Sequence, residues 1–173
     1  MATVVVLNGT SSSGKTTIAR AFQELAPGLF LNFSIDSILY ALPSSARDRI
    51  TNGADFSDLN IPNLVRAYYS CVRQLLDLGH DLVIDNAVTA SYQAEALREA
   101  VEGHRVLMVG LDCSAEILAQ RERERGDRRA GMAVAQHARI HTLLQYDLMI
   151  DSASESAHDA AAKIAAALQS LPA

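Results

Sequence analysis

The first residues of the chain hold a motif that few folds can accommodate. An apolar run at 4–7 is followed by Asn8 and then by the pattern G-x-x-x-x-G-K-T over residues 9–16. This spacing is typical of a loop that wraps a phosphate group between a strand and a helix. Glycines let backbone N–H groups turn inward, and the free N–H groups of the following helix add positive potential. The sequence therefore predicts a strand at 4–7, a phosphate-binding loop and a helix over 15–25.

Each position of this loop has an expected role. Lys15 should reach the terminal phosphates as a point charge, and we predict it both to bind nucleotide and to act in catalysis. The Thr16 hydroxyl should bind nucleotide and ligate Mg²⁺. The other loop residues should hold the triphosphate of ATP, and they are Gly9, Thr10, Ser11, Ser12, Ser13, Gly14 and Thr17.

Composition and charge limit the class of protein. The chain has 173 residues, 49% of them apolar, which suits a single folded domain over 1–173. Its formal net charge of −5 disfavours non-specific binding to nucleic acid, which needs many Lys and Arg residues. No secretory pattern or membrane-length apolar stretch is present, so we expect a cytoplasmic protein with no membrane partner. Cys71 and Cys113 are expected to be buried free thiols.

Strand and helix patterns alternate along the whole chain. Further strands are expected at 30–35, 81–84, 105–111 and 147–150, and helices at 37–42, 64–78, 91–101, 115–125, 132–144 and from Ser156 onward. The polar stretch 44–63 is expected to be a long loop. This order predicts an α/β protein with a five-stranded parallel sheet and helices on both faces. Functional residues should then lie beyond the carboxyl ends of the strands.

Two carboxylates stand where the second and third strands are expected to end. Asp36 follows the run 33–35, and Asp85 closes the run 82–84. A carboxylate that faces the phosphate can accept the proton of a substrate hydroxyl, and one beside the loop can hold Mg²⁺. We expect Asp36 to be the catalytic base and Asp85 to bind the metal with Thr16. The sequence also allows the two acids to exchange roles or to cap helices.

Arginines cluster in one later segment, at Arg121, Arg123, Arg125, Arg128 and Arg129. Charge runs are often solvated helix faces, and the intervening Glu122 and Glu124 favour that interpretation for Arg123. The break at Gly126 instead indicates a helical lid over about 121–133. A lid excludes water, and its arginines can neutralise charge on the transferred phosphoryl group. Arg128 is expected to be catalytic, and Arg125 or Arg121 to contact the nucleotide.

These motifs together resemble those of chloramphenicol phosphotransferase and its relatives among the P-loop kinases. The resemblance lies in the phosphate loop, in the segments 35–37 and 83–85, and in R-G-D-R-R-A-G-M-A over 125–133. It implies a three-layer P-loop kinase fold that uses ATP and Mg²⁺. It also implies transfer of the γ-phosphoryl group to a hydroxyl of chloramphenicol or a similar small molecule, with Asp36 matching the family's proposed catalytic base.

The acceptor is expected to bind across about 36–69, where aromatic side chains gather. These are Tyr40, Phe56, Tyr68 and Tyr69, and core packing explains the two adjacent tyrosines equally well. His137 and His141 have the spacing of zinc ligands, but no third ligand accompanies them in the sequence, so zinc is not expected.

Two other functions fit the same residues. One is a kinase for another metabolite, such as a sugar acid, a shikimate-like compound or a nucleoside. The other is a nucleotide-binding regulatory module that hydrolyses ATP slowly. The absence of an N-K-x-D motif disfavours a GTPase, and the absence of L-S-G-G-Q disfavours a transporter ATPase. The set of acids and arginines favours a kinase, because a protein that only binds nucleotide needs neither.

Overall fold

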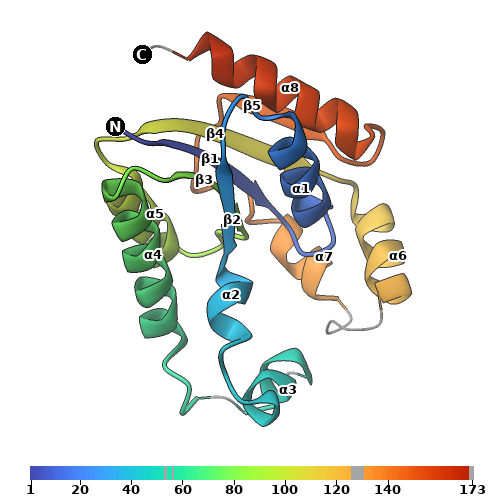
Figure 1. The fold of residues 1–173 in the computed structure, drawn as a ribbon. Helices are drawn as coiled ribbons and strands as arrows, with labels where there is room; N and C mark the ends of the chain where they lie inside the picture. The colour runs from blue at the N-terminus through green and yellow to red at the C-terminus, as the bar shows by residue number, and fades with distance from the viewer. Residues whose placement is uncertain (53, 56, 126–130, 172–173) are drawn as a thin grey trace.

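The protein is built on a parallel sheet whose strand order is β2-β3-β1-β4-β5 (Figure 1). The computed structural model describes residues 1–52, 54–55, 57–125 and 131–171. The strands are β1 (Thr3–Gly9), β2 (Phe30–Ser34), β3 (Asp81–Asn86), β4 (Arg105–Asp112) and β5 (Leu148–Asp151). All the pairings are parallel, so the predicted five-stranded α/β sheet is confirmed.

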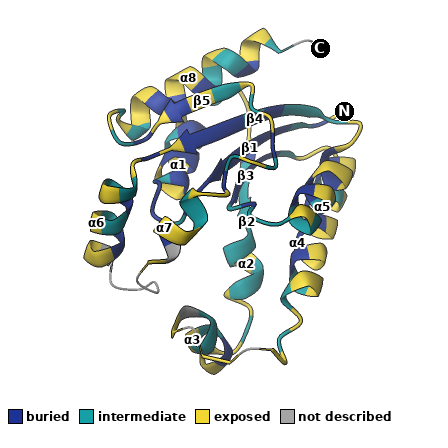
Figure 2. Cartoon of the chain, turned by 180° about the vertical axis from the view of Figure 1, so that it is seen from behind, coloured by how far each residue is buried: buried dark blue, intermediate teal, exposed yellow. Residues whose placement is uncertain are grey.

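Helices cover both faces of this sheet. α1 (Lys15–Leu25) and α8 (Ala157–Ser170) pack on one face, and α4 (Ile61–Asp77) and α5 (Ser91–Val101) pack on the other. The sides of these helices that face the sheet are buried (Figure 2). The other helices of the described residues lie beyond the carboxyl ends of the strands, and they are α2 (Ile35–Leu39), α3 (Ser44–Asn52), α6 (Ala115–Arg125) and α7 (Met132–His137). Within the described ranges, none of the helices has the length and apolar character needed to cross a membrane.

The central strand explains the apolar run that precedes the phosphate loop. Val4 and Val6 of β1 pack in one core with α4 and α5, whereas Val5 and Leu7 pack in a second core with α1 and α8. All four side chains are fully buried. A strand that is covered on both faces needs apolar residues at every position, so the run is continuous rather than alternating.

The expectation of a long loop over 44–63 is wrong. α3 occupies the first part of this stretch, and α4 begins at Ile61 with Pro62 in its first turn. Proline is tolerated there because the first N–H groups of a helix have no helical partner. α3 is polar, so its sequence shows no apolar period that would predict a helix. Arg49 of α3 forms an ion pair with Asp58.

The boundary between the second strand and the next helix also differs from expectation. β2 ends at Ser34 and α2 follows without a gap, so the elements expected at 30–35 and 37–42 meet earlier than predicted. Asp36 therefore lies in the first turn of α2 rather than at the end of the strand. Free N–H groups in the first turn of a helix favour an acid at this position.

The helix expected over 132–144 is much shorter in the structure, because α7 ends at His137. The following turn is held by a few backbone hydrogen bonds, such as Ile140 N to Gln136 O at 3.0 Å, and by side chains. The carbonyl of Ile140 accepts hydrogen bonds from Asn8 Nδ2 at 2.9 Å and from the Tyr146 hydroxyl at 3.1 Å. The first of these partners stands in β1, far away in sequence, so a local pattern could not reveal it.

One of the two cysteine expectations is also wrong. Cys113 is buried, but Cys71 is exposed on α4. Its neighbours Tyr68 and Val72 carry the buried side of that helix. The apolar sequence around Cys71 thus reflects one side of an amphipathic helix and not full burial.

Candidate active site

The phosphate loop joins β1 to α1 at the carboxyl edge of the sheet. A Cβ atom at Gly9 would lie 2.7 Å from Ser13 Oγ and 3.0 Å from the carbonyl oxygen of Leu111, so only glycine fits there. Gly14 has a left-handed backbone with φ of +87°, and Ser12 has φ of +61°. Such dihedral angles are rare for residues with side chains, and they wind the loop so that its N–H groups can converge.

Lys15, Thr16 and Asp85 meet at the mouth of this loop. The Thr16 hydroxyl donates a 2.6 Å hydrogen bond to Asp85 Oδ2. The buried Lys15 Nζ donates to the Thr10 carbonyl at 2.7 Å and lies 3.8 Å from Asp85 Oδ1. The structure therefore brings together a cation, a hydroxyl and a carboxylate from distant parts of the chain.

The loop fits a phosphate chain and a hard cation. Among the described residues, the buried hydroxyl oxygens of Ser12 and Ser13 have no hydrogen-bond partner. Buried polar groups are normally paired, so these two point to a bound group that supplies the partner. Lys15 and the N-terminus of α1 favour an anion, while the oxygens of Thr16 and Asp85 are of the type that Mg²⁺ prefers.

A hollow of about 430 Å³ lies beside the loop. Its lining includes Ser13, Gly14 and Thr17 on one side and Arg121 and Ser152 on the other. This volume is within the range of small-ligand sites. The hollow is thus placed for the part of a nucleotide that extends away from its phosphates.

Arg121 is fixed on the wall of this hollow. Its guanidinium donates to the Ser152 carbonyl at 2.8 Å and lies 3.7 Å from Cys113 Sγ. Burial raises the pKa of the Cys113 thiol, and the Arg121 charge opposes this effect. A raised pKa disfavours the thiolate, so the geometry indicates a structural cysteine and not a nucleophile.

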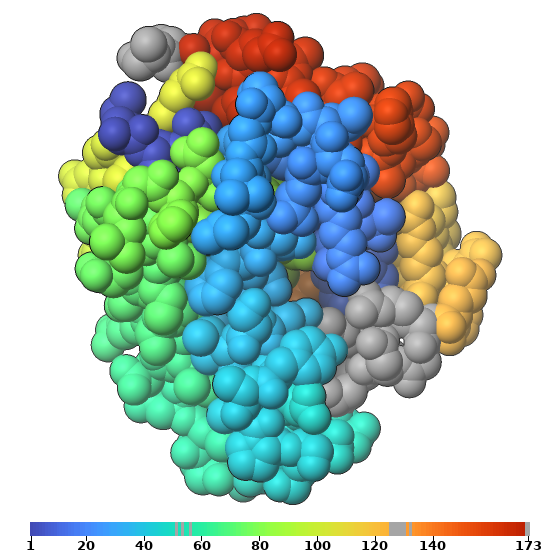
Figure 3. All heavy atoms as spheres, in the orientation of Figure 1, coloured from blue at the N-terminus to red at the C-terminus, as the bar shows by residue number. Residues whose placement is uncertain are grey.

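Asp36 follows the strand that neighbours the strand of Asp85. Ser34 at the end of β2 is in register with Asp85 of β3, and Asp36 comes two residues later in the half-buried first turn of α2. In Figure 3 the surface is hollowed between α2 and the start of α1, the elements that carry Asp36 and Lys15. Both predicted acids therefore belong to one edge of the sheet.

The predicted lid is the part of the site that the structure describes least. Arg128 and Arg129 lie outside the described residues, together with the predicted break at Gly126, and so does the side chain of Arg125. Arg123 is exposed, in agreement with a solvated position. The catalytic role of Arg128 and the nucleotide contact of Arg125 stay predictions.

Comparison with known proteins decides the family. Residues 2–169 match the family described as chloramphenicol phosphotransferase-like protein. The chain belongs to this family. A Mycobacterium tuberculosis protein with a provisional O-phosphotransferase name is 31% identical over 188 residues, covering 98% of this chain and 83% of the relative. The resemblance inferred from the sequence is confirmed, and the chain is a phosphotransferase of the small-molecule kinase type.

Solved structures support the fold of this chloramphenicol phosphotransferase-like protein. A sugar kinase from Janibacter sp. HTCC2649 superposes with a TM-score of 0.74 at 22% identity, covering 98% of this chain and 95% of that one. The tunicamycin resistance protein of Deinococcus radiodurans superposes with a TM-score of 0.71 at 19% identity, covering 99% and 98%. At such identities the likeness establishes the fold alone.

Sequence reasoning missed three residues that organise the site of this family member. Glu122 stands in a run of charged residues but is only 4% exposed, and its carboxylate accepts hydrogen bonds from the N–H groups of Gly131 and Ala133. Gln136 Oε1 accepts from the N–H of Ser11 at 2.7 Å. The third residue is the buried Asn8, whose Oδ1 accepts from Val88 N. No local pattern marks Glu122 or Gln136, because their partners are backbone groups of other segments.

Asn8 joins three segments at the edge of the sheet. Its Nδ2 donates to Ile140 O and to the Tyr146 hydroxyl, while its Oδ1 accepts from Val88 N at 2.8 Å. The only available signal was its position directly before Gly9. A fully used, fully buried amide at this point fixes the start of the phosphate loop relative to the chain that follows Asp85.

His137 and His141 both lie close to Asp112, the last residue of β4. Nε2 of His137 lies 4.0 Å and Nε2 of His141 lies 3.9 Å from Asp112 Oδ1, and His141 Nδ1 lies 3.0 Å from the Tyr146 hydroxyl. In the part of the chain that the structure describes, no group of three His, Cys, Asp or Glu side chains has the geometry to hold a metal ion.

The aromatic residues of the expected acceptor region have separate roles. Tyr68 is fully buried, its hydroxyl donates to the Phe33 carbonyl at 2.9 Å, and its ring stacks on Phe33. Tyr69 is also buried, whereas Tyr40 is 63% exposed beneath the guanidinium of Arg47. Core packing therefore explains the two adjacent tyrosines, and Phe56 lies outside the described residues.

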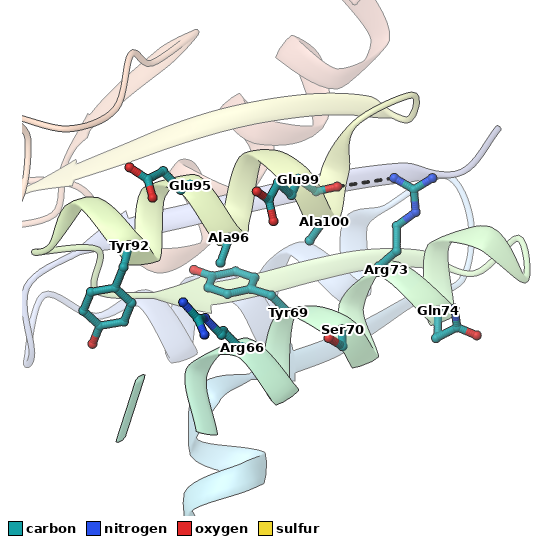
Figure 4. A pocket seen from close by; sticks show the side chains of 10 residues that line it. All are labelled: Arg66, Tyr69, Ser70, Arg73, Gln74, Tyr92, Glu95, Ala96, Glu99 and Ala100. Carbon is teal, nitrogen blue, oxygen red and sulfur yellow. Dashed lines mark hydrogen bonds between the residues drawn. The ribbon is translucent and has the colours of Figure 1, made fainter. Parts of the chain in front are cut away.

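A second hollow runs between α4 and α5 (Figure 4). Arg66 and Tyr92 lie toward one end of it, and Arg73 at the other end donates to the carbonyls of Glu99 and Glu102. The residues that line it are separate from those of the hollow at the phosphate loop. The contact of Arg73 with α5 indicates that this groove is part of the packing between the two helices.

Proposed function

We propose that the chain is an ATP-dependent O-phosphotransferase that moves the γ-phosphoryl group to a hydroxyl of chloramphenicol or a similar small molecule. The observation that carries this proposal is the meeting of Lys15, Thr16 and Asp85 at the mouth of the phosphate loop. A loop that only binds phosphate does not need a carboxylate at its metal-facing threonine. A phosphotransferase does, because the charge of the triphosphate must be neutralised during transfer.

The loop and its neighbours hold the donor. The N–H groups of the loop and Lys15 bind the β- and γ-phosphates, and Lys15 leaves its present contact with the Thr10 carbonyl to do so. Thr16 and Asp85 hold Mg²⁺, which when bound neutralises and orients the phosphate oxygens. The part of ATP beyond its phosphates lies in the hollow lined by Arg121 and Ser152.

Asp36 serves the acceptor. Its carboxylate takes the proton of the acceptor hydroxyl while the oxygen of that hydroxyl forms a bond to the γ-phosphorus. The bond between the γ-phosphorus and the bridging oxygen breaks, and ADP leaves with the electron pair. Arg128 neutralises the transferred group, and Arg125 contacts the nucleotide.

The family supports chloramphenicol as the acceptor to test first, because the family description names that drug. A second acceptor class is a sugar or sugar acid, which the fold likeness to the Janibacter sugar kinase favours. Both classes present a hydroxyl to the same carboxylate. The segments that surround the acceptor set the choice between them.

The decisive experiment measures ADP release from Mg²⁺-ATP with and without chloramphenicol. Lys15→Ala is the test variant, and Arg20→Ala is its control, because Arg20 is an exposed cation on the same helix. Stimulation by the drug that is lost in Lys15→Ala and kept in Arg20→Ala supports the proposal. Stimulation by sugar acids alone selects the second acceptor class, and ATP turnover that no acceptor stimulates contradicts the phosphotransferase proposal.

A further inference from the structure

We propose that α7 is a strut that fixes the end of α6 relative to the phosphate loop, with Glu122 and Gln136 as its two positioning residues. The inference rests on the proposed function, because α6 matters to catalysis only if it forms a wall of the nucleotide site. Neither residue touches the reacting atoms in this scheme. They act by holding Arg121 and the phosphate loop in one fixed relationship.

The first attachment of the strut is the carboxylate of Glu122. Both of its oxygens are used, since Oε2 accepts from Gly131 N at 2.6 Å and Oε1 accepts from Ala133 N at 3.0 Å. Glu122 is 4% exposed, whereas its neighbours Arg123 and Glu124 are exposed. A buried carboxylate is costly unless it is fully hydrogen-bonded, so this one is retained for the bonds it makes.

Apolar packing reinforces this attachment. Ala133 of α7 and Leu118 of α6 are both fully buried, and they pack in one small cluster with Cys113, which directly follows β4. Gly131 directly precedes α7 and has φ of +84°, a left-handed conformation, and its N–H donates to Glu122. The two helices are thus joined by hydrogen bonds and by contact, and both are tied to the end of a central strand.

The second attachment joins α7 to the phosphate loop. Gln136 Oε1 accepts a 2.7 Å hydrogen bond from the N–H of Ser11, the third residue of the loop. Gln136 lies three residues after Ala133, so less than one helical turn separates the two attachments. The turn after α7 is held as well, because Asn8 Nδ2 donates to the Ile140 carbonyl.

The other end of the connection is the wall of the nucleotide hollow. Arg121 is the residue before Glu122, and it lines the hollow together with Ser12 and Ser13 of the loop. One continuous path therefore runs from Ser11 through Gln136, α7 and Glu122 to Arg121. Because the contacts along this path are buried or half-buried and closely packed, a small displacement of α7 should also displace Arg121 relative to the phosphate loop.

The test compares kcat with the Kd for ATP in Glu122→Gln and Gln136→Met. Glutamine keeps one acceptor oxygen but turns an NH2 group toward a backbone N–H, and methionine removes the acceptor while keeping the shape of the side chain. We expect kcat to fall about 10- to 100-fold in each, since misplacement by an ångström has effects of this size. The Kd for ATP should change far less, because Lys15 and the loop N–H groups other than that of Ser11 are untouched in both variants.

The matched control is Glu116→Gln, which removes the same charge from an exposed position on α6 and should leave kcat unchanged. If the strut is one device, the double variant Glu122→Gln with Gln136→Met should be no slower than the slower single variant. Multiplying effects in the double variant would overturn the proposal. So would a Glu122→Gln enzyme as active as the control.

A readout that needs no acceptor separates this inference from the proposed function. Hydrogen exchange of the Gly131 and Ala133 amides should be faster in Glu122→Gln than in Glu116→Gln, by more than the difference in global stability between the two variants explains. Unchanged exchange would overturn the strut even if no acceptor were ever found. A fall of kcat that is fully explained by the fraction of unfolded protein would also overturn the proposal, because Glu122 would then contribute to stability alone.

Discussion

The hydroxyl of Thr16 donates a 2.6 Å hydrogen bond to Asp85, which joins the start of α1 to the end of β3 at the mouth of the phosphate loop. The carboxylate is 10% exposed at its side chain and also lies 3.8 Å from Lys15 Nζ. In the proposed function, opening the contact between Thr16 and Asp85 would free an oxygen of each for Mg²⁺.

Asp85→Asn is expected to raise the Mg²⁺ concentration needed for half-maximal turnover and to lower kcat by about 100-fold or more. The amide keeps the shape and the acceptor oxygen for Thr16 but loses the charge that the cation requires. The measurement is a titration of ATP turnover with Mg²⁺. Glu24→Gln, an exposed acid on α1, is the control, and equal Mg²⁺ dependence in the two variants would remove Asp85 from the metal site.

Asp36→Ala is expected to lower kcat with the true acceptor by about 10² to 10⁴-fold, the range of general base catalysis. ATP binding should be nearly unchanged, because the residue lies on α2 and not on the phosphate loop. Single-turnover assays and ATP titration give the two quantities. Ser37→Ala, at the exposed neighbouring position, should behave as wild type, and wild-type turnover by Asp36→Ala would exclude the residue from the mechanism.

Gly9→Ala is expected to abolish tight ATP binding. The new Cβ would lie 2.7 Å from Ser13 Oγ and 3.0 Å from Leu111 O, and the second contact is with a strand backbone that cannot move aside. Gly28→Ala is the matched control, since its Cβ would meet no heavy atom within 4 Å. Calorimetric ATP titration of both variants decides the matter, and comparable affinities would show that the loop relaxes around the methyl group.

Much of the fold follows from local sequence because β1 is buried on both faces and the later strands end at polar residues. The phosphate loop, Thr16 and Asp85 were predictable for this reason, as the carboxyl ends of parallel strands share one edge. α3 was not, because it is a polar helix whose sequence lacks an apolar period. Glu122 was not either, since its partners are N–H groups of a segment that only the tertiary fold brings near.

The stability of the protein should fall as the pH is lowered through the range just below 6.5. Burial lowers the pKa of His141, the nearby His137 lowers it further, and Asp112 opposes both. In the window between this depressed pKa and the ordinary value near 6.5, the unfolded chain binds a proton that the folded chain does not, so acid favours unfolding. The effect is modest, because His141 is only partly buried.

Melting temperatures measured between pH 7.5 and 5 test this sign. His141→Gln should make the melting temperature depend less on pH in that window. His80→Gln, at an exposed position after α4, should leave the pH dependence unchanged. Acids such as Asp77 and Asp151, whose pKa values lie below the ordinary value, contribute only at lower pH. A slope that is identical in wild type and His141→Gln would contradict the assignment.

Tyr68→Phe is expected to destabilise the protein by about 1–3 kcal/mol without changing the KM for the acceptor. The hydroxyl is fully buried and donates to the Phe33 carbonyl at 2.9 Å, so its removal leaves a buried backbone oxygen without this partner. Tyr40→Phe, at a 63% exposed position, should change stability little. Urea unfolding and acceptor titrations separate the two roles. The hydrogen bond to Phe33 indicates that the Tyr68 hydroxyl stabilises the packing of α4 on β2. A raised KM with unchanged stability in Tyr68→Phe would instead place that hydroxyl in the acceptor pocket.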